Sequence, residues 1–151
     1  MPLFGTLRAL NALIRTCRDG EAVCRAWGGA AQSPGLRELL WQRSQEWARQ
    51  ADELQALVLL FDGRPARAGT LGGQVLAAWI RAKASLLGRG DLPVLLDWEH
   101  MQRRALRRYQ QVLGARLPER VRRTVTLQAS RLCAHHHRLE DLRGHFAAHS
   151  H

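Results

Sequence analysis

Apolar residues recur at intervals of three and four along almost the whole of this 151-residue chain, and strict alternation of apolar and polar residues is absent. Intervals of three and four place side chains on one face of an α-helix, whereas alternation is typical of a half-buried strand. The pattern therefore predicts an all-α protein. We expect a single domain over residues 1–151, with a core at about 6–146 and a histidine-containing tail at 147–151.

Glycine, proline and capping residues divide this pattern into separate helices. Ser33-Pro34 is a strong start signal, because serine caps a helix and proline suits its first turn. Asp62-Gly63 and the glycines on either side of Arg89 are stop signals. We expect long helices at about residues 6–27, 33–61, 91–113 and 118–146, and a shorter helix at about 71–87.

The long connector at about residues 62–90 predicts how the helices are arranged. Its helix of about 17 residues would be roughly 25 Å long, which is enough to run the length of a bundle. The second and third long helices are then parallel rather than antiparallel. Four long amphipathic helices with one such crossover form a ferritin-like four-helix bundle.

A carboxylate interrupts the apolar face of the first helix. Glu21 stands between Cys17 and Cys24, at a position where the spacing predicts an apolar residue. If the first and third long helices are antiparallel, as the crossover requires, Glu21 and Glu99 lie at one level of the bundle. The other polar residues expected on inward faces at or near this level are Ser44, Gln102, Gln128, His135 and His136.

Such a layer resembles part of a metal centre. Di-iron and di-manganese bundles use a glutamate from each of two helices and a Glu-x-x-His pair from each of the other two. This chain offers the two single glutamates but neither pair. Three interpretations stay open: a hydrogen-bonded structural layer that includes Ser44, Gln102 and Gln128; a weak site for iron or another divalent metal; and a di-iron centre. The expected ligands are Glu21, Glu99, His135 and His136.

The net charge of +10 comes almost entirely from arginine, since Lys83 is the only lysine. This excess permits attraction to polyanions, although arginine usage in a genome of high GC content is the favoured explanation. No helix-turn-helix, zinc-finger or aromatic stacking pattern is present, so nucleic-acid binding would be non-specific and sensitive to salt. The candidate polyanion-binding residues are Arg103, Arg104, Arg107, Arg108, Arg120 and Arg123; the alternative is a solvated basic face.

Several familiar classes of protein lack their signatures here. The chain has no P-loop, dinucleotide or nucleophile-elbow motif, which favours a non-enzymatic role. No apolar stretch is long enough to span a membrane and no secretory pattern is seen, so we expect a cytoplasmic protein without a membrane partner. Trp41 falls off the main apolar face of its helix, and we expect it to contact the crossover helix or a second copy in a homo-oligomer.

Four segments carry a resemblance to a known family. They are LNALIRTCRDGEAVCRA at 10–26, ADELQALV at 51–58, GTLGGQVLAAWIRAKA at 69–84 and LLDWEHMQRRALRRYQQVL at 95–113. Together with Gln128 and His136, they resemble the bacterial ferritin-like bundles of domain of unknown function 2383, over about residues 7–142. The resemblance implies a bacterial, cytoplasmic ferritin-like bundle without an established activity. Members often carry further acidic residues where this chain has Gln102 and Arg103.

These observations lead to two expectations for function. The first is a non-catalytic, stress-related ferritin-like bundle whose layer of glutamate and histidine is a weak or vestigial metal site. The second is a basic binding or oligomerisation bundle that contacts nucleic acid or another polyanion through its arginines.

Overall fold

The computed structural model describes residues 2–87 and 90–149, which form five α-helices and, over those ranges, no strand. The all-α prediction is confirmed. The helices are α1 (Pro2–Ala30), α2 (Pro34–Leu60), α3 (Leu71–Leu87), α4 (Asp91–Leu113) and α5 (Glu119–His149). The first helix begins earlier and the last ends later than the sequence predicts, so most of the expected tail is helical. Residues 150 and 151 of that tail lie outside the described residues.

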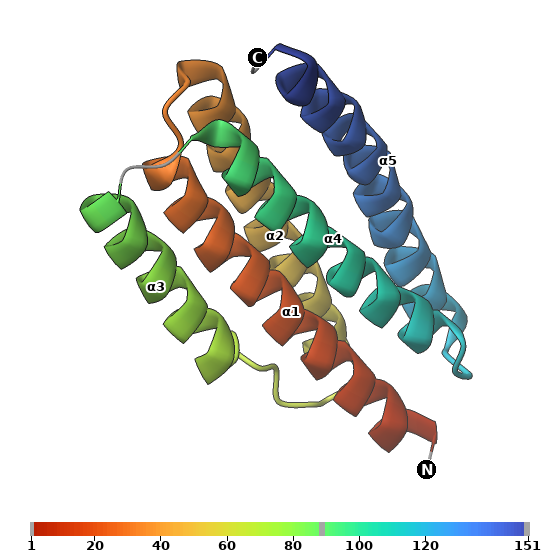
Figure 1. The fold of residues 1–151 in the computed structure, drawn as a ribbon. Coiled ribbons are helices and arrows are strands. Elements are labelled where there is room, and N and C mark those ends of the chain that lie inside the picture. The colour runs from red at the N-terminus through yellow and green to blue at the C-terminus, as the bar shows by residue number, and fades with distance from the viewer. Residues whose placement is uncertain (1, 88–89, 150–151) are drawn as a thin grey trace.

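Four of the helices, α1, α2, α4 and α5, lie side by side, and α3 packs on the outside of α1 (Figure 1). The chain runs up α1 and down α2, returns along α3, and then runs down α4 and up α5 (Figure 1). Because α3 carries the chain back along the molecule, α2 and α4 point in the same direction. The most extensive contact is between α1 and α2, followed by those of α1 with α3 and of α4 with α5, whereas α2 and α5 touch only lightly.

Side chains of α1 and α2 fix the segment that leads from α2 into α3. Asn11 accepts a hydrogen bond from Ala66 N at 2.8 Å and donates one to Arg64 O at 3.0 Å. Gln55 donates to Ala66 O at 2.8 Å. Three backbone polar groups of the loop therefore find partners on the helices beneath it, which holds the loop against the bundle.

Asp19 attaches the beginning of α3 to the middle of α1. Its carboxylate accepts from both the backbone N–H and the hydroxyl of Thr70, each at 2.8 Å. The Thr70 hydroxyl in turn accepts from Gly73 N at 3.0 Å, which caps the helix. Cβ atoms at Gly69 and Gly73 would lie little more than 2 Å from the Asp19 carboxylate. Glycine at both positions therefore allows the close approach of α3 to α1.

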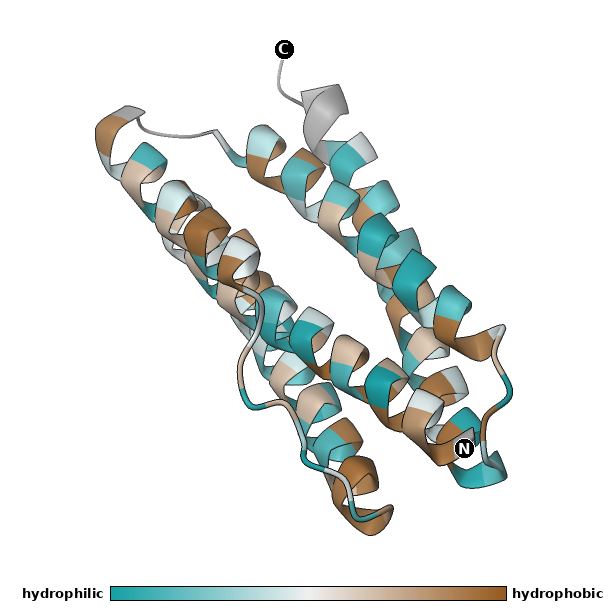
Figure 2. Cartoon of the chain, turned by 90° about the horizontal axis from the view of Figure 1, so that it is seen from below, coloured by the Kyte–Doolittle hydropathy of each residue, from teal (hydrophilic) through white to brown (hydrophobic). Residues whose placement is uncertain are grey.

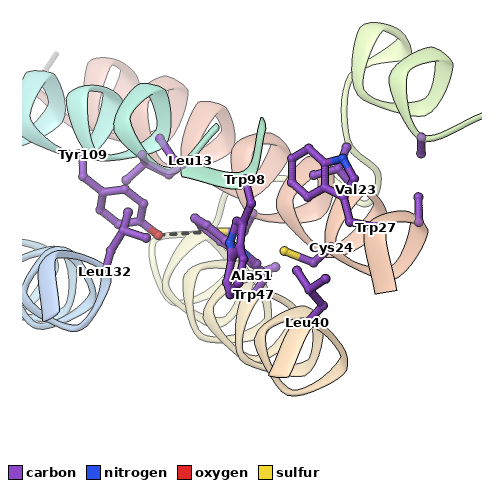
Figure 3. Packing of buried hydrophobic residues seen from close by; sticks show 14 of the residues in the cluster. Leu13, Val23, Cys24, Trp27, Leu40, Trp47, Ala51, Trp98, Tyr109 and Leu132 are labelled. Atoms are coloured by element: carbon purple, nitrogen blue, oxygen red, sulfur yellow. Dashed lines mark hydrogen bonds between the residues drawn. The ribbon is translucent and has the colours of Figure 1, made fainter. Parts of the chain in front are cut away.

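The core is formed by apolar side chains of all five helices, and Trp27, Trp98 and Tyr109 are its largest fully buried members (Figure 3). Hydrophilic residues dominate α5, whereas α3 is coloured largely as apolar (Figure 2). None of the described helices is both long enough and apolar enough to cross a membrane.

Gly20 occupies the inward position of α1 where the sequence predicts Glu21. The indole ring of Trp47 from α2 lies directly over it, and a Cβ on Gly20 would be 2.6 Å from that ring. Trp47 is only 3% exposed. The missing side chain of Gly20 therefore makes room for a buried tryptophan between α1 and α2, so here a helix-weakening glycine serves packing.

We expect Gly20→Ala to lower the free energy of unfolding. The gain in helix propensity is about 1 kcal/mol, but overpacking a rigid indole costs about 1–3 kcal/mol. Urea denaturation measures the difference. Gly144→Ala on α5 is the matched control, because nothing lies within 4 Å of its Cβ position, and it should stabilise the protein. An equal gain at both positions would contradict the packing described for Gly20.

Candidate functional site

The phenol of Tyr109 lies at the centre of the bundle and connects all four long helices. Tyr109 projects inward from α4 (Figure 3). Its hydroxyl is 3.1 Å from Cys17 Sγ on α1, 3.0 Å from Gln50 Nε2 on α2 and 2.7 Å from Gln128 Oε1 on α5. We call these four residues the Tyr109 network. Cys17, Tyr109 and Gln128 are completely buried, and Gln50 is 6% exposed.

Every polar atom at the centre of this network has a defined role. Gln128 accepts from Tyr109 through Oε1 and donates through Nε2 to the backbone oxygen of Gln50 at 3.2 Å. The Tyr109 hydroxyl therefore uses its single proton on Gln128. It accepts one hydrogen bond from the amide of Gln50 and, through its remaining lone pair, a second from the thiol of Cys17. A fully satisfied network of this kind stabilises one arrangement of the helices.

The network is electrically neutral around physiological pH. Burial raises the pKa of the Cys17 thiol to about 12 and raises the pKa of Tyr109 well above its usual value of 10. Burial also raises the pKa of Cys24 to about 12, although a hydrogen bond with Trp47 opposes the shift. Neither thiol is a nucleophile near neutral pH, because that chemistry requires the thiolate. The Tyr109 network therefore consists of neutral groups that hold the four long helices together.

The three residues predicted for a structural polar layer are all buried, but only Gln128 belongs to the Tyr109 network. Ser44 donates to Trp41 O of its own helix at 2.7 Å. Gln102 lies beside a cavity of about 10 Å³ that Gln50 and His135 also line, and its Oε1 has no protein partner. That volume matches a single water molecule. The polar positions predicted from the sequence include none of Tyr109, Cys17 and Gln50, although a glutamine facing inward on α2 was the available signal.

The structure places Glu21 at the edge of the α1–α2 contact rather than in the core. Its side chain is 21% exposed and pairs with Arg18 at 3.1 Å and Arg25 at 3.4 Å. Arg18 also reaches Asp52 on α2 at 2.9 Å. The expectation of a buried carboxylate at this position is wrong by one residue, because Gly20 holds the inward slot.

Glu99 is buried as predicted, with a side chain only 4% exposed, but two guanidinium groups take up its carboxylate. Arg103, one turn later on α4, binds Oε1. Arg143 from α5 brings its Nε to 2.5 Å from Oε2, in an ion contact without hydrogen-bond geometry. A buried carboxylate needs neutralisation of this kind, and the pairing fastens α5 to α4 near the end of the chain.

The two predicted histidine ligands also have protein partners. His135 Nε2 lies 3.2 Å from Glu46 on α2, and His136 Nε2 lies 3.1 Å from Glu140 on its own helix. Burial and the neighbouring Arg43 lower the pKa of His135, while Glu46 opposes the shift. His135 thus belongs to a polar cluster between α2 and α5.

This arrangement does not fit iron or another divalent metal. Glu21 and Glu99 are each paired with two arginines, and the histidines pair with other carboxylates. Within residues 2–87 and 90–149, no three histidine, cysteine, aspartate or glutamate side chains are grouped closely enough to hold a metal ion. Guanidinium groups beside Glu99 would repel a cation, so the chemistry of these residues does not support metal binding.

The six predicted polyanion-binding arginines are all exposed, but they fall into different environments. Arg103 is held by Glu99. Arg122 on α5, which is not one of the six, donates to Leu113 O at 3.0 Å and Ala115 O at 2.6 Å and so caps α4. The remaining members of the predicted set, which pair with no carboxylate of the described chain, are Arg104, Arg107, Arg108, Arg120 and Arg123.

Three of these arginines line hollows along the junction of α1 and α4. Arg104 and Arg108 border one hollow of about 330 Å³, together with Asp19 and the beginning of α3. They and Arg107 border a second hollow of about 370 Å³ beside Ala12 and Thr16 of α1. No acidic residue lines the second hollow. We call Arg104, Arg107 and Arg108 the α4 arginine face.

We expect Tyr109→Phe to lower the free energy of unfolding by about 1–3 kcal/mol, because it removes the hydrogen-bond partner of Gln50 Nε2 and of Gln128 Oε1 in the core. Adding Gln128→Leu to Tyr109→Phe should cost less than the sum of the two single changes. A double-mutant cycle measured by urea denaturation tests this coupling. Strict additivity would mean that the hydroxyl and the amide do not act as a unit.

Stability should fall as the pH rises above about 9. Cys17 and Cys24 keep their protons in the folded chain up to about pH 12 but lose them near pH 9 when the chain unfolds. The stabilisation is therefore complete below pH 9 and is lost between pH 9 and 12, at about 1.4 kcal/mol per pH unit for each thiol. Denaturation at several pH values should show that the free energy of unfolding falls less steeply with pH in Cys17→Ala/Cys24→Ala than in the wild-type protein.

Tyr109 supplies an internal check on the same experiment, because it is the only tyrosine. Its pKa is raised well above 10 by burial, so tyrosinate absorbance should appear only when the protein unfolds. Ionisation near pH 10 in folded protein would contradict the buried Tyr109 network.

Comparison with known proteins places these features in a family. A family model described as Domain of unknown function (DUF2383) matches residues 5–115. No curated protein matches the chain. The matched region contains most of α1, all of α2 to α4 and three members of the Tyr109 network, whereas Gln128 and Arg143 of α5 lie beyond it. Since the match covers well over half of the 151 residues, the chain belongs to the DUF2383 family, a family defined by a domain of unknown function.

Proposed function

We propose that this protein is a non-catalytic, ferritin-like four-helix bundle that binds nucleic acid through the α4 arginine face. The arrangement of α1, α2, α4 and α5 with one long crossover is the feature that supports the ferritin-like assignment. Binding rather than catalysis is supported by the protonated state of the buried thiols and the phenol.

The observation that carries the proposal is that Arg104, Arg107 and Arg108 are exposed and pair with no carboxylate of the described residues. They are spaced by three and four residues, so they project from one side of α4. A guanidinium group that is not engaged by a carboxylate is free to bind phosphate in a bidentate manner. Other arginines are engaged by carboxylates, as Arg18 with Asp52 and Arg43 with Glu46 illustrate.

The overall charge of the protein also favours binding to nucleic acid. With 23 basic and 13 acidic residues, the net charge of +10 attracts a phosphate backbone over long range. The face contains no exposed aromatic residue for base stacking, because Tyr109 of the same helix is buried. We therefore expect binding that tracks phosphates and does not read sequence.

The same contacts argue against the alternative of a weak or vestigial metal site. A carboxylate already neutralised by Arg103 and Arg143 has little affinity left for a cation. Glu99 with its two arginines is better explained as an anchor between α4 and α5.

The variant Arg104→Glu/Arg108→Glu should weaken binding to mixed-sequence duplex DNA by at least about tenfold. Each lost phosphate contact also reduces the salt dependence, so the slope of log K against log salt should become shallower by about two. Fluorescence anisotropy across a series of salt concentrations measures both effects.

The matched control is Arg64→Glu/Arg67→Glu, which changes the net charge equally but lies in the exposed loop between α2 and α3. It should retain most of the affinity. If both variants lose the same affinity, binding depends on net charge alone and does not use the α4 arginine face specifically. Absence of binding by the wild-type protein at low salt would refute nucleic acid as the ligand.

A further inference from the structure

The outward side of α3 is apolar and uncovered. Ala77 and Ile80 are buried toward α1, yet on the opposite side Leu71 is 78%, Trp79 is 61% and Leu86 is 83% exposed. A helix that is apolar all round is normally buried on all sides, and Figure 2 shows how apolar α3 is compared with α5. The contact with α1 explains only one of its two apolar sides.

The exposed apolar residues of α3 form a continuous stripe at helical spacing. We call this set the outer stripe, and its members are Leu71, Val75, Ala78, Trp79, Ala82 and Leu86. Single exposed apolar residues are common on protein surfaces, whereas a contiguous set marks an interaction site. The outer stripe shares no residue with the α4 arginine face, so it needs an explanation of its own.

The spacing of residues in the outer stripe is the same in both directions. The successive intervals are four, three, one, three and four, and their midpoint lies between Ala78 and Trp79. Two antiparallel copies of α3 related by a two-fold axis at that midpoint place Leu71 opposite Leu86, and Val75 opposite Ala82. Trp79 then lies opposite Ala78, so each large side chain at the centre meets a small one.

The charges of α3 are compatible with this pairing. The helix contains no acidic residue, and its two charged residues are Arg81 and Lys83. In the antiparallel register, Arg81 lies opposite Leu76 and Lys83 lies opposite Gln74 of the second copy. Like charges therefore do not face each other, as a symmetric interface requires.

We propose that a second copy of this chain packs antiparallel on the outer stripe of α3 and forms a two-fold homodimer. The stripe runs along a helix of 17 residues, which is about 25 Å long. One helix pair of this length gives an interface at the small end of the range for specific dimers. The dimer therefore dissociates on dilution. The Trp79 side chain of each copy, buried near the centre against Ala78 of the other copy, contributes most of the affinity.

Light scattering after size exclusion, from low micromolar to near-millimolar concentration, tests the dimer. The wild-type mass should rise from 17.0 kDa toward twice that value. Trp79→Glu should weaken dimerisation at least about tenfold and keep the wild-type circular dichroism, because its side chain is largely exposed. The matched control is Trp41→Glu on α2, where a second tryptophan is 46% exposed under Arg25. That variant should still dimerise.

A monomer at every concentration would overturn the proposal and would assign the outer stripe to a different partner. A dimer that Trp79→Glu leaves unchanged, or that Trp41→Glu disrupts equally, would also overturn it.

Cysteine cross-linking tests the register independently. In a Cys133→Ser background, which removes the one cysteine that is not fully buried, Val75→Cys/Ala82→Cys should form covalent dimers on mild oxidation. Within one chain these positions are about 10 Å apart along the helix, so they cannot form a disulfide with each other. Val75→Cys alone should form few dimers, because its own copy lies equally far away. Equal dimer yield from the single and double variants would refute the antiparallel register.

Discussion

The hydroxyl of Tyr109 is the point on which the arrangement of the long helices depends. One phenol receives hydrogen bonds from α1 and α2 and donates one to α5, and Gln128 returns a bond to the backbone of α2. Apolar side chains alone tolerate sliding of one helix along another, but this network is satisfied in one register only. It matters most between α2 and α5, which otherwise touch only lightly.

The sequence is sufficient to predict the all-α class, five helices and most of their ends, because apolar spacing and capping residues are local signals. It misplaces the inward face of α1 by one residue. A glycine in the sequence indicates a weak point of a helix. Only the contact with the indole of Trp47, on another helix, shows that Gly20 faces the core. Glu99 was recognisable as buried, but its neutralisation by Arg143 joins residues 44 positions apart and has no local signature.

The arginines illustrate why composition does not define a site. Arg103 neutralises a buried carboxylate, Arg122 caps the end of α4, and Arg104 borders an open hollow. In the sequence these three belong to one basic cluster, yet only the last type keeps its guanidinium available for phosphate. The basic cluster of the sequence thus combines exposed arginines that have no carboxylate partner with arginines that hold the fold together.

The crossover helix α3 has apolar surface residues that the fold of one chain does not require. The fold needs an apolar inner side on α3, glycines at its beginning and the carboxylate of Asp19 to hold it on α1. It does not need the outer side to be apolar, since polar residues there would leave every contact with α1 unchanged. Leu71, Trp79 and Leu86 are therefore not explained by the stability of one chain, and exposed apolar area of this extent carries a cost in solubility. Their symmetric spacing is accounted for when the second partner of α3 is another α3.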